Sequence, residues 1–122
     1  MARLARRSRP GPLTRLALVA RFFGERFPYV QTVEDAYLLL DIAAHEEQGC
    51  PMTVKAILHS GIGSYATLPR RIRRLERLGV VVRRRGARDG RVREAILHAS
   101  ARKALTQFAQ SVFGASRLDL HG

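Results

Sequence analysis

The sequence has a single cysteine, Cys50, and no tryptophan among its 122 residues. A lone cysteine excludes a disulfide bond within the chain, as is usual for proteins that fold in a reducing compartment. Cys50 stands next to a proline at the expected end of a helix, and we expect it to be a partly buried structural residue rather than a redox sensor. No apolar run approaches the roughly 20 residues of a membrane-spanning helix, so we expect no membrane partner.

Acidic residues and lysine are scarce as well. Ten aspartates and glutamates stand against 22 basic residues, which gives a formal net charge of +12, and all but two of the basic residues are arginine. Such a balance implies an acidic partner: DNA, RNA or an anionic surface. Arginine is the side chain best suited to phosphate and guanine, although a GC-rich genome produces the same bias.

Groups that could carry out catalysis are also missing. The four histidines have no metal-ligand spacing: His45, His59, His98 and His121. No glycine-rich phosphate loop is present, and the adjacent carboxylates Glu46 and Glu47 are expected to lie at a solvated helix end. A zinc site needs three or four side chains that converge on the metal, and this sequence offers no such set. We therefore expect a protein that is not an enzyme and has no cofactor or metal ion.

The sequence does contain a strong helical pattern over residues 64–78. Three apolar residues recur at i, i+4 and i+7 and form one stripe: Leu68, Ile72 and Leu75. Ser64 is a suitable N-cap, and Gly79 suits the left-handed residue that ends a helix. Pro69 lies in the first turn of this helix, where we expect a slight kink.

The opposite face of this helix carries Arg70, Arg73 and Arg77. Like charges three and four residues apart destabilise an isolated helix by a few tenths of a kcal/mol each. The segment from Ser64 to Arg93 holds 11 arginines and only two acidic residues. A polyanion offsets this repulsion, and nucleic acid is the commonest polyanion. The alternative is a solvated arginine surface without a partner.

Four further helices are expected, over residues 13–27, 31–49, 53–60 and 101–113. Helix caps are expected at Thr32, Thr53 and Ser100. In the helix over 31–49, the stripe expected to face the core is Val33, Tyr37, Leu40 and Ala44, widened by Leu38 and Ala43. The same helix holds five of the ten acidic residues, so we expect it to face away from a polyanion.

A β-hairpin is expected over residues 80–98. Three consecutive valines favour the first strand, apolar residues alternate along the second strand, and glycines mark the loop between them. We expect Asp89 to pair with Arg88 or Arg91 and to order the tip of the hairpin.

The order of these elements predicts a winged helix-turn-helix domain, mainly α with a small β-hairpin wing. From Thr53 to Arg102 the chain resembles the MarR family of bacterial transcription regulators. The resemblance depends on Thr53, Ser64, Thr67, Arg70, Arg74-Leu75-Glu76, Gly79-Val80-Val81, Arg85 and Asp89-Gly90-Arg91. We expect a domain over 13–114, a disordered basic arm over 1–12 and a loose tail over 115–122.

The resemblance implies that the helix over 64–78 enters the major groove of double-stranded DNA and that the wing lies on the adjacent minor groove or backbone. Tyr65, Ala66, Thr67 and Arg70 are expected nearest the bases. The expected DNA-binding residues are Ser64, Tyr65, Ala66, Thr67, Arg70, Arg71, Arg73, Arg74, Arg77, Arg83, Arg84, Arg85, Arg88 and Arg91. The expected function is sequence-specific regulation of transcription in the bacterial cytoplasm, at the nucleoid.

The first and last helices carry apolar stripes that so small a domain cannot cover by itself. We therefore expect a homodimer, with the interface formed by Leu16, Val19, Phe23, Leu105, Phe108 and Val112. Two recognition helices about 34 Å apart would then read a pseudo-palindrome. The last helix is shorter than is usual for the family, and the sequence leaves a small-molecule effector open.

Three alternatives stay open at this point. A plasmid or phage replication or partition protein that binds DNA would share these features. A small basic protein that binds RNA or the ribosome would also carry this charge. The arginine-rich start of the chain, which lacks acidic residues up to Gly24, has some features of a mitochondrial presequence.

Overall fold

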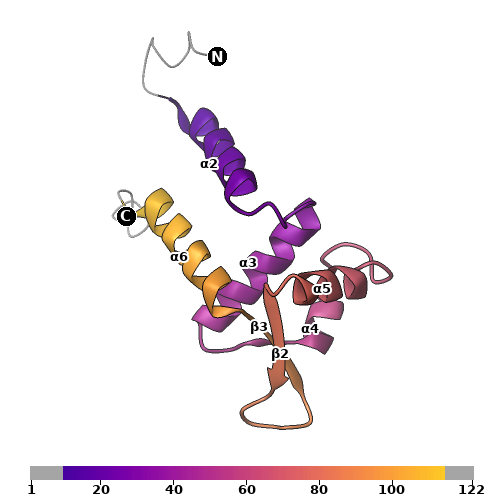
Figure 1. The fold of residues 1–122 in the computed structure, drawn as a ribbon. Coiled ribbons are helices and arrows are strands. Elements are labelled where there is room, and N and C mark those ends of the chain that lie inside the picture. The colour runs from indigo at the N-terminus through magenta and orange to yellow at the C-terminus, as the bar shows by residue number, and fades with distance from the viewer. Residues whose placement is uncertain (1–9, 115–122) are drawn as a thin grey trace.

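The computed structural model describes residues 10–114 and has the expected winged helix-turn-helix fold (Figure 1). The elements in chain order are α2 (Pro12–Arg26), α3 (Val33–Glu47), β1 (Met52–Thr53), α4 (Val54–Leu58), α5 (Leu68–Arg77), β2 (Val81–Arg85), β3 (Arg93–Leu97) and α6 (Ala99–Phe113). The expected basic arm lies outside the described residues as far as residue 9, and so does the expected tail over 115–122. Pro12, assigned to the arm from the sequence, is the first residue of α2.

The sheet has three antiparallel strands in the order β1-β3-β2. The wing hairpin pairs β2 with β3 from Val81 opposite Leu97 to Arg85 opposite Arg93. Strand β1 was not predicted from the sequence. The strand has only two residues, and the second of them, Thr53, also caps α4. β1 joins the start of α4 to the wing by pairing with β3.

The core lies where α3, α4 and α5 pack against the sheet. Its fully buried members include Leu38, Leu39, Ile42, Ile57, Leu68, Ile72, Leu75, Ala95 and Leu97. The apolar stripe that the sequence predicted for α5 therefore faces the core. Burial of one such side chain contributes about 1.5–3 kcal/mol, so this cluster fixes how α5 is seated.

The prediction for the inner face of α3 was wrong for its main stripe and right for Leu38, one of the two residues expected to widen it. Val33 is 62% exposed, Tyr37 58% and Leu40 45%, whereas α3 buries Asp35, Leu38, Leu39 and Ile42. Both faces of α3 are apolar, so helical spacing alone does not distinguish them. The observed face is the one that also brings a buried carboxylate against α5.

Helix α5 begins at Leu68, four residues later than predicted. Ser64 does not cap a helix at this point, since its hydroxyl accepts the N–H of Ala66 within a turn. Pro69 has no N–H to donate to the carbonyl of Tyr65, so regular helix starts around the proline. Pro69 thereby occupies the first turn, where its missing donor costs least.

Two of the four predicted helix N-caps are confirmed. The hydroxyl of Thr32 accepts the N–H of Asp35 at 3.1 Å, and that of Thr53 accepts the N–H of Ala56 at 3.0 Å. Ser100 was the wrong cap for α6, because the helix begins at Ala99 and Nδ1 of His98 accepts the N–H of Ser100 at 3.2 Å.

Two further predictions near the end of α3 were wrong. Cys50 is exposed rather than partly buried. Glu46 is not solvated, since only 12% of its side chain is exposed. One carboxylate oxygen of Glu46 accepts the N–H of Leu97 at 3.0 Å and the other pairs with Arg102. Glu46 therefore joins α3 to the last strand of the wing and to the first turn of α6.

The end of α5 follows the Schellman arrangement. Gly79 has a φ of +75°, the N–H of Val80 donates to the carbonyl of Leu75 at 2.9 Å, and the N–H of Gly79 donates to that of Glu76 at 3.0 Å. An L-residue in this conformation is strained, because its Cβ approaches the following carbonyl. Gly79 turns the chain directly from α5 into the wing.

We expect Gly79→Ala to lower the free energy of unfolding by about 1–2 kcal/mol, because a Cβ meets no neighbour within 4 Å there and only the backbone strain counts. Urea denaturation measures this change. Gly90→Ala is the matched control, since its added Cβ is also in open space and Gly90 lacks a positive φ. Equal unfolding midpoints for the two variants would show that the left-handed conformation of Gly79 does not require glycine.

Candidate nucleic-acid interface

The outward face of α5 is a row of arginines. Arg70, Arg73 and Arg77 are exposed, and none of their guanidinium groups has a hydrogen bond or ion pair to residues 10–114. They lie opposite the apolar residues that anchor α5 in the core. Three cations are thus held on a rigid helix without a counter-charge from the described part of the chain.

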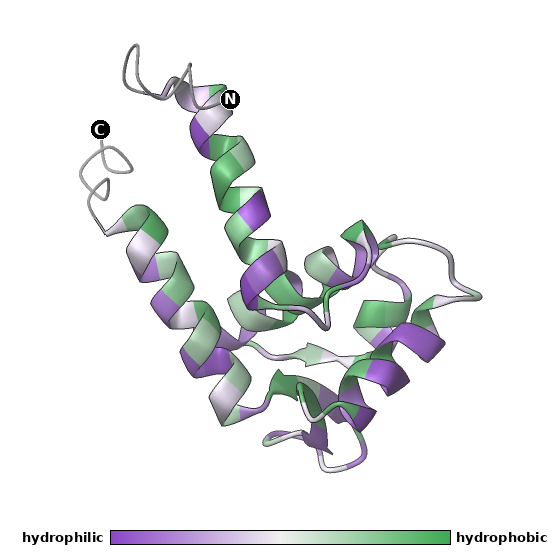
Figure 2. Ribbon diagram, turned by 45° about the horizontal axis from the view of Figure 1, so that its top comes forward, coloured by the Kyte–Doolittle hydropathy of each residue, from purple (hydrophilic) through white to green (hydrophobic). Residues whose placement is uncertain are grey.

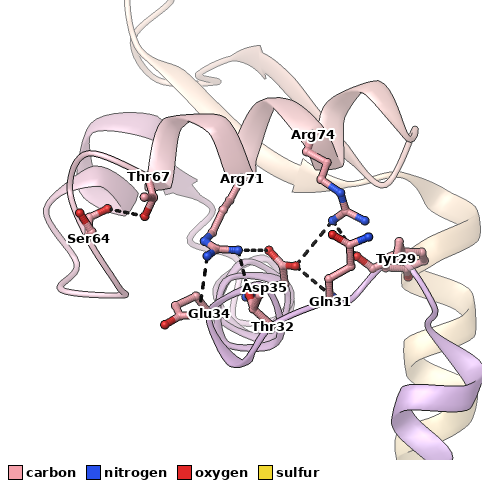
Figure 3. Close-up of polar contacts among 9 residues, drawn as sticks. All are labelled: Tyr29, Gln31, Thr32, Glu34, Asp35, Ser64, Thr67, Arg71 and Arg74. Carbon is pink, nitrogen blue, oxygen red and sulfur yellow. Dashed lines mark hydrogen bonds and ion pairs between the residues drawn. The ribbon is translucent and has the colours of Figure 1, made fainter.

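Arg71 and Arg74 point the other way, toward the start of α3 (Figure 3). Nη1 of Arg71 lies 3.4 Å from Oδ1 of Asp35, and Nη1 of Arg74 lies 3.6 Å from Oδ2 of the same carboxylate. Only 2% of the Asp35 side chain is exposed, against 27% and 26% for the two arginines. We call Asp35, Arg71 and Arg74 the aspartate clamp.

Neighbouring groups complete the aspartate clamp. Arg71 donates to the hydroxyl of Thr32 at 2.9 Å, and Arg74 donates to the carbonyl of Tyr29 at 2.8 Å. The backbone N–H of Gln31 donates to Asp35 at 3.0 Å. Among the described buried side-chain atoms, Nε of Arg71 alone has no hydrogen-bond partner. The clamp thus fixes α5 to α3 through charge-assisted hydrogen bonds, which are stronger than neutral ones.

The aspartate clamp bears on two expectations from the sequence. Arg71 and Arg74 were expected to bind DNA, and the structure engages both with Asp35 of α3. The physical reason is helical phase: residues 71 and 74 are three apart and share the face of α5 that meets α3. The helix that holds Glu34 and Asp35 was expected to face away from a polyanion; both residues lie behind α5, where Glu34 is 3.9 Å from Arg71, and that expectation stays a prediction.

The turn before α5 presents Tyr65 and Ala66 outward. Ser64 and Thr67 keep this turn in shape, because the Ser64 hydroxyl accepts the N–H of Ala66 at 3.1 Å and the Thr67 hydroxyl donates to the Ser64 carbonyl at 3.2 Å. Tyr65 is 61% exposed, and its ring lies 5.6 Å from that of His59. His59 was not recognised in the sequence, where it looked like an isolated histidine.

The wing arginines are divided between paired and unpaired side chains. Arg83 donates to both carboxylate oxygens of Glu76 at 2.9 and 3.0 Å, which ties β2 to α5, and Arg84 donates to Glu94 at 3.3 Å. Arg85 and Arg88 are exposed and have no such partner within residues 10–114. The wing is therefore anchored by carboxylates at its base and keeps unpaired cations toward its tip.

Asp89 organises the tip of the wing through Arg91. Its carboxylate accepts the backbone N–H of Arg91 at 3.0 Å and the guanidinium of Arg91 at 3.2 and 3.3 Å. These side-chain and then backbone hydrogen bonds lower the pKa of Asp89 below its usual value of 3.8. The carboxylate therefore stays charged, and keeps the tip in shape, at pH values where a free aspartate is protonated.

A second surface lies away from α5. An open groove of about 1150 Å³ separates α2, α3 and α6, and all six residues expected at a dimer interface line it: Leu16, Val19, Phe23, Leu105, Phe108 and Val112. Val33, Leu40 and Ala44 of α3 line it too, so the face of α3 that was assigned to the core lies here instead. Figure 2 shows apolar residues along α2 where it stands away from the domain.

Aromatic packing joins the C-terminal part of α2 to α6 beside this groove. Phe23 lies 5.6 Å and Phe27 5.7 Å from Phe108 between ring centroids, both in edge-on geometry. Phe27, which follows α2, is buried, whereas α2 itself buries no residue. The other residues of α2 therefore keep part of their surface in solvent.

Within residues 10–114, no three His, Cys, Asp or Glu side chains lie close enough together to hold a metal ion. None of the described helices is both long enough and apolar enough to cross a membrane.

Comparison with known proteins identifies structural relatives only. No protein-family model matches the sequence, and no curated protein does. A mutant of MepR from S. aureus matches with a TM-score of 0.60 and 25% identity over 86% of this chain and 73% of that one. A second MepR mutant, bound to an oligodeoxyribonucleotide, matches with a TM-score of 0.58 and 23% identity over 85% and 74% of the two chains. A third MepR mutant, from a clinical isolate of S. aureus, matches with a TM-score of 0.59 and 20% identity over 93% of this chain and 83% of that one. MepR is a MarR-family regulator, so the chain has the winged-helix fold of that family, as its sequence resemblance implied.

We expect Asp35→Asn to lower the free energy of unfolding by about 2–3 kcal/mol, because it leaves two arginines without their carboxylate. The loss is smaller than that of a fully buried pair, since both arginines keep about a quarter of their side chain in solvent. Urea denaturation at neutral pH tests this.

The control for that substitution is Asp41→Asn, which makes the same change in the same helix. The side chain of Asp41 has no ion pair with the described residues, so the control is expected within about 0.5 kcal/mol of wild type. If both variants unfolded at the same urea concentration, the aspartate clamp would not contribute to stability.

The carboxyl ¹³C resonance of Asp89 is expected to titrate with a midpoint below 3.8. The lowered pKa means that this group contributes stability above pH 3.8, and that the contribution disappears as the pH falls through the lowered value. Arg91→Ala raises the midpoint only partly, because the backbone hydrogen bond remains. Arg88→Ala is the control, because it removes the same charge but no hydrogen bond to Asp89. If Arg88→Ala raised the midpoint of Asp89 more than Arg91→Ala does, the hydrogen bonds of Arg91 would not be the cause of the lowered pKa.

Proposed function

We propose that the protein is a dimeric, sequence-specific regulator of transcription that binds double-stranded DNA through α5 and the wing. One observation carries the proposal: the arginines on the two faces of α5 differ in whether they have a carboxylate partner. Those facing α3 share a buried carboxylate, whereas Arg70, Arg73 and Arg77 face outward without any counter-charge from residues 10–114. A polyanion supplies the missing charge.

The fold supports DNA as that polyanion. The major groove of B-DNA is about 12 Å wide and admits one α-helix, and the second helix of a helix-turn-helix is the one that enters it. In this chain that helix is α5. A MepR mutant of the same fold is bound to an oligodeoxyribonucleotide. A-form RNA has a deep, narrow major groove that such a helix cannot enter.

In the proposed complex the exposed turn before α5 leads into the groove. Tyr65 and Ala66 lie nearest the bases, with Ser64 and Thr67 shaping the turn and Arg70 following one helical turn later. Arg73 and Arg77 reach base edges or phosphates further along. On the wing, the proposed phosphate or minor-groove contacts are Arg83, Arg84, Arg85, Arg88 and Arg91, of which Arg85 and Arg88 have no ion-pair partner within residues 10–114.

The groove between α2, α3 and α6 supports the dimer. Leu16 is 65% exposed there, and apolar side chains from three helices line the space without covering it. A second copy of the chain is the proposed occupant, because a two-fold axis would bring the same apolar surface against itself. Two α5 helices would then read half-sites about one DNA turn apart.

The proposed role needs no cofactor, metal ion or enzymatic step, since reading a base sequence requires only hydrogen bonds and apolar contacts. We place the protein in the cytoplasm, at the nucleoid. A replication or partition protein would use the same surface, and the genes adjacent to the selected DNA sequence distinguish these roles.

Selection from a random duplex pool at about 150 mM salt, followed by sequencing, tests the proposal. We expect a two-fold symmetric motif with half-sites one helical turn apart. Binding without an enriched motif, or stronger binding to duplex RNA in a parallel selection, would contradict it.

Two arginine variants separate base reading from phosphate binding. On the selected duplex, Arg70→Ala is expected to reduce discrimination at one position of each half-site by about 5- to 150-fold. Arg85→Ala is expected to weaken all sequences alike and to lower the salt slope by about one. Lys103→Ala, an exposed charge on α6, is the control. Uniform loss of affinity with Arg70→Ala would show that Arg70 does not read bases.

The dimer is tested by sedimentation at micromolar concentration. We expect wild-type protein to be dimeric and Leu16→Glu to be monomeric, because the glutamate places a charge in the apolar groove. Leu13→Glu is the matched control on the same helix, since Leu13 is 81% exposed and lies outside the groove. A monomeric wild type, or equal behaviour of both variants, would exclude this interface.

A further inference from the structure

The ring of Tyr65 has one aromatic neighbour, His59. Their centroids are 5.6 Å apart and their planes are tilted by 48°. This separation is within the range where aromatic rings attract each other. The other aromatic contacts of the described residues all belong to Phe23, Phe27, Tyr29 and Phe108.

The contact spans the turn of the helix-turn-helix. His59 ends α4, and Tyr65 lies in the turn before α5. Between them Gly61 and Gly63 have φ values of +81° and +66°, and glycine restrains the backbone least of all residues. Ile62 anchors the inner side of this turn in the core, where it is 9% exposed. The His59 ring supplies the corresponding support on the outer side.

We propose that His59 is a positioning residue that holds the ring of Tyr65 in the orientation in which Tyr65 reads a base. The inference rests on the proposed DNA binding and adds to it a residue that itself contacts no DNA. An exposed tyrosine ring samples several rotamers, and fixing one of them on binding costs affinity. A ring already held by a neighbour avoids much of that cost.

The chemistry required of His59 is a flat ring rather than a charge or a hydrogen bond. Neither ring nitrogen of His59 has a hydrogen bond to the described residues. A phenyl ring should therefore replace the imidazole, whereas a methyl group should not. This distinguishes positioning from a direct phosphate contact, which needs the ring nitrogens.

The experiment repeats the duplex selection with full-length wild type and with Tyr65→Ala, His59→Ala and His59→Phe, and compares base preferences position by position. Thermal unfolding of each variant confirms that these exposed substitutions leave the fold intact. We expect Tyr65→Ala to lose the preference at one position of each half-site. His59→Ala should weaken the preference at that same position by about 2- to 12-fold, the range of one aromatic pair, and His59→Phe should keep it.

Three results would overturn the inference: Tyr65→Ala alters no position, His59→Ala weakens every position equally, or His59→Phe behaves like His59→Ala. The outcome for wild type separates the two proposals. If wild type enriches no motif, the proposed function fails and this inference fails with it. If wild type enriches a motif and His59→Ala leaves it unchanged, only the role of His59 is refuted.

Discussion

The buried carboxylate of Asp35 determines how the recognition helix is presented. A charge that is 1% exposed is expensive to bury unless it is paired and hydrogen-bonded. Asp35 meets that requirement only when Arg71 and Arg74 both face α3 and the N–H of Gln31 points at it. Any rotation of α5 about its axis would break these contacts, so the clamp sets which arginines face outward.

Helix α3 connects the two candidate surfaces. Its first turn holds α5 through the aspartate clamp. Its last turn holds the end of β3 and the start of α6 through Glu46, which accepts the N–H of Leu97 and pairs with Arg102. Its exposed apolar side lines the groove where a second copy is proposed to bind. The wing, the recognition helix and the groove are therefore all positioned by contacts to this one helix.

The features predicted correctly from the sequence are those that depend on residues close together in the chain. The stripe of α5, the caps at Thr32 and Thr53, the left-handed Gly79 and the order of helices and wing all follow from spacing and from residue types at helix ends. The fold class and the resemblance to the MarR fold were correct for that reason.

Other features depend on partners far along the chain, and the sequence could not supply them. The inner face of α3 is set by residues about 36 positions later, since Asp35 pairs with Arg71. The two-residue strand β1 exists only because β3 pairs with it. Arg71 and Arg70 are identical and adjacent in the sequence, yet one is bound to α3 and the other is exposed. The cap at Thr32 was predicted from the sequence, but nothing nearby showed that Asp35 would be buried against another helix.

Carboxylates pair with only some of the arginines of α5 and the wing. Arg71, Arg74, Arg83, Arg84 and Arg91 each lie within 4.0 Å of a carboxylate, and these contacts hold α5, the wing base and the wing tip in place. Arg70, Arg73, Arg77, Arg85 and Arg88 have no such partner within residues 10–114. Their mutual repulsion is a cost to the free protein that salt screens only beyond about 8–10 Å. The DNA partner that we propose would bring the negative charge that this row of arginines lacks within the described residues.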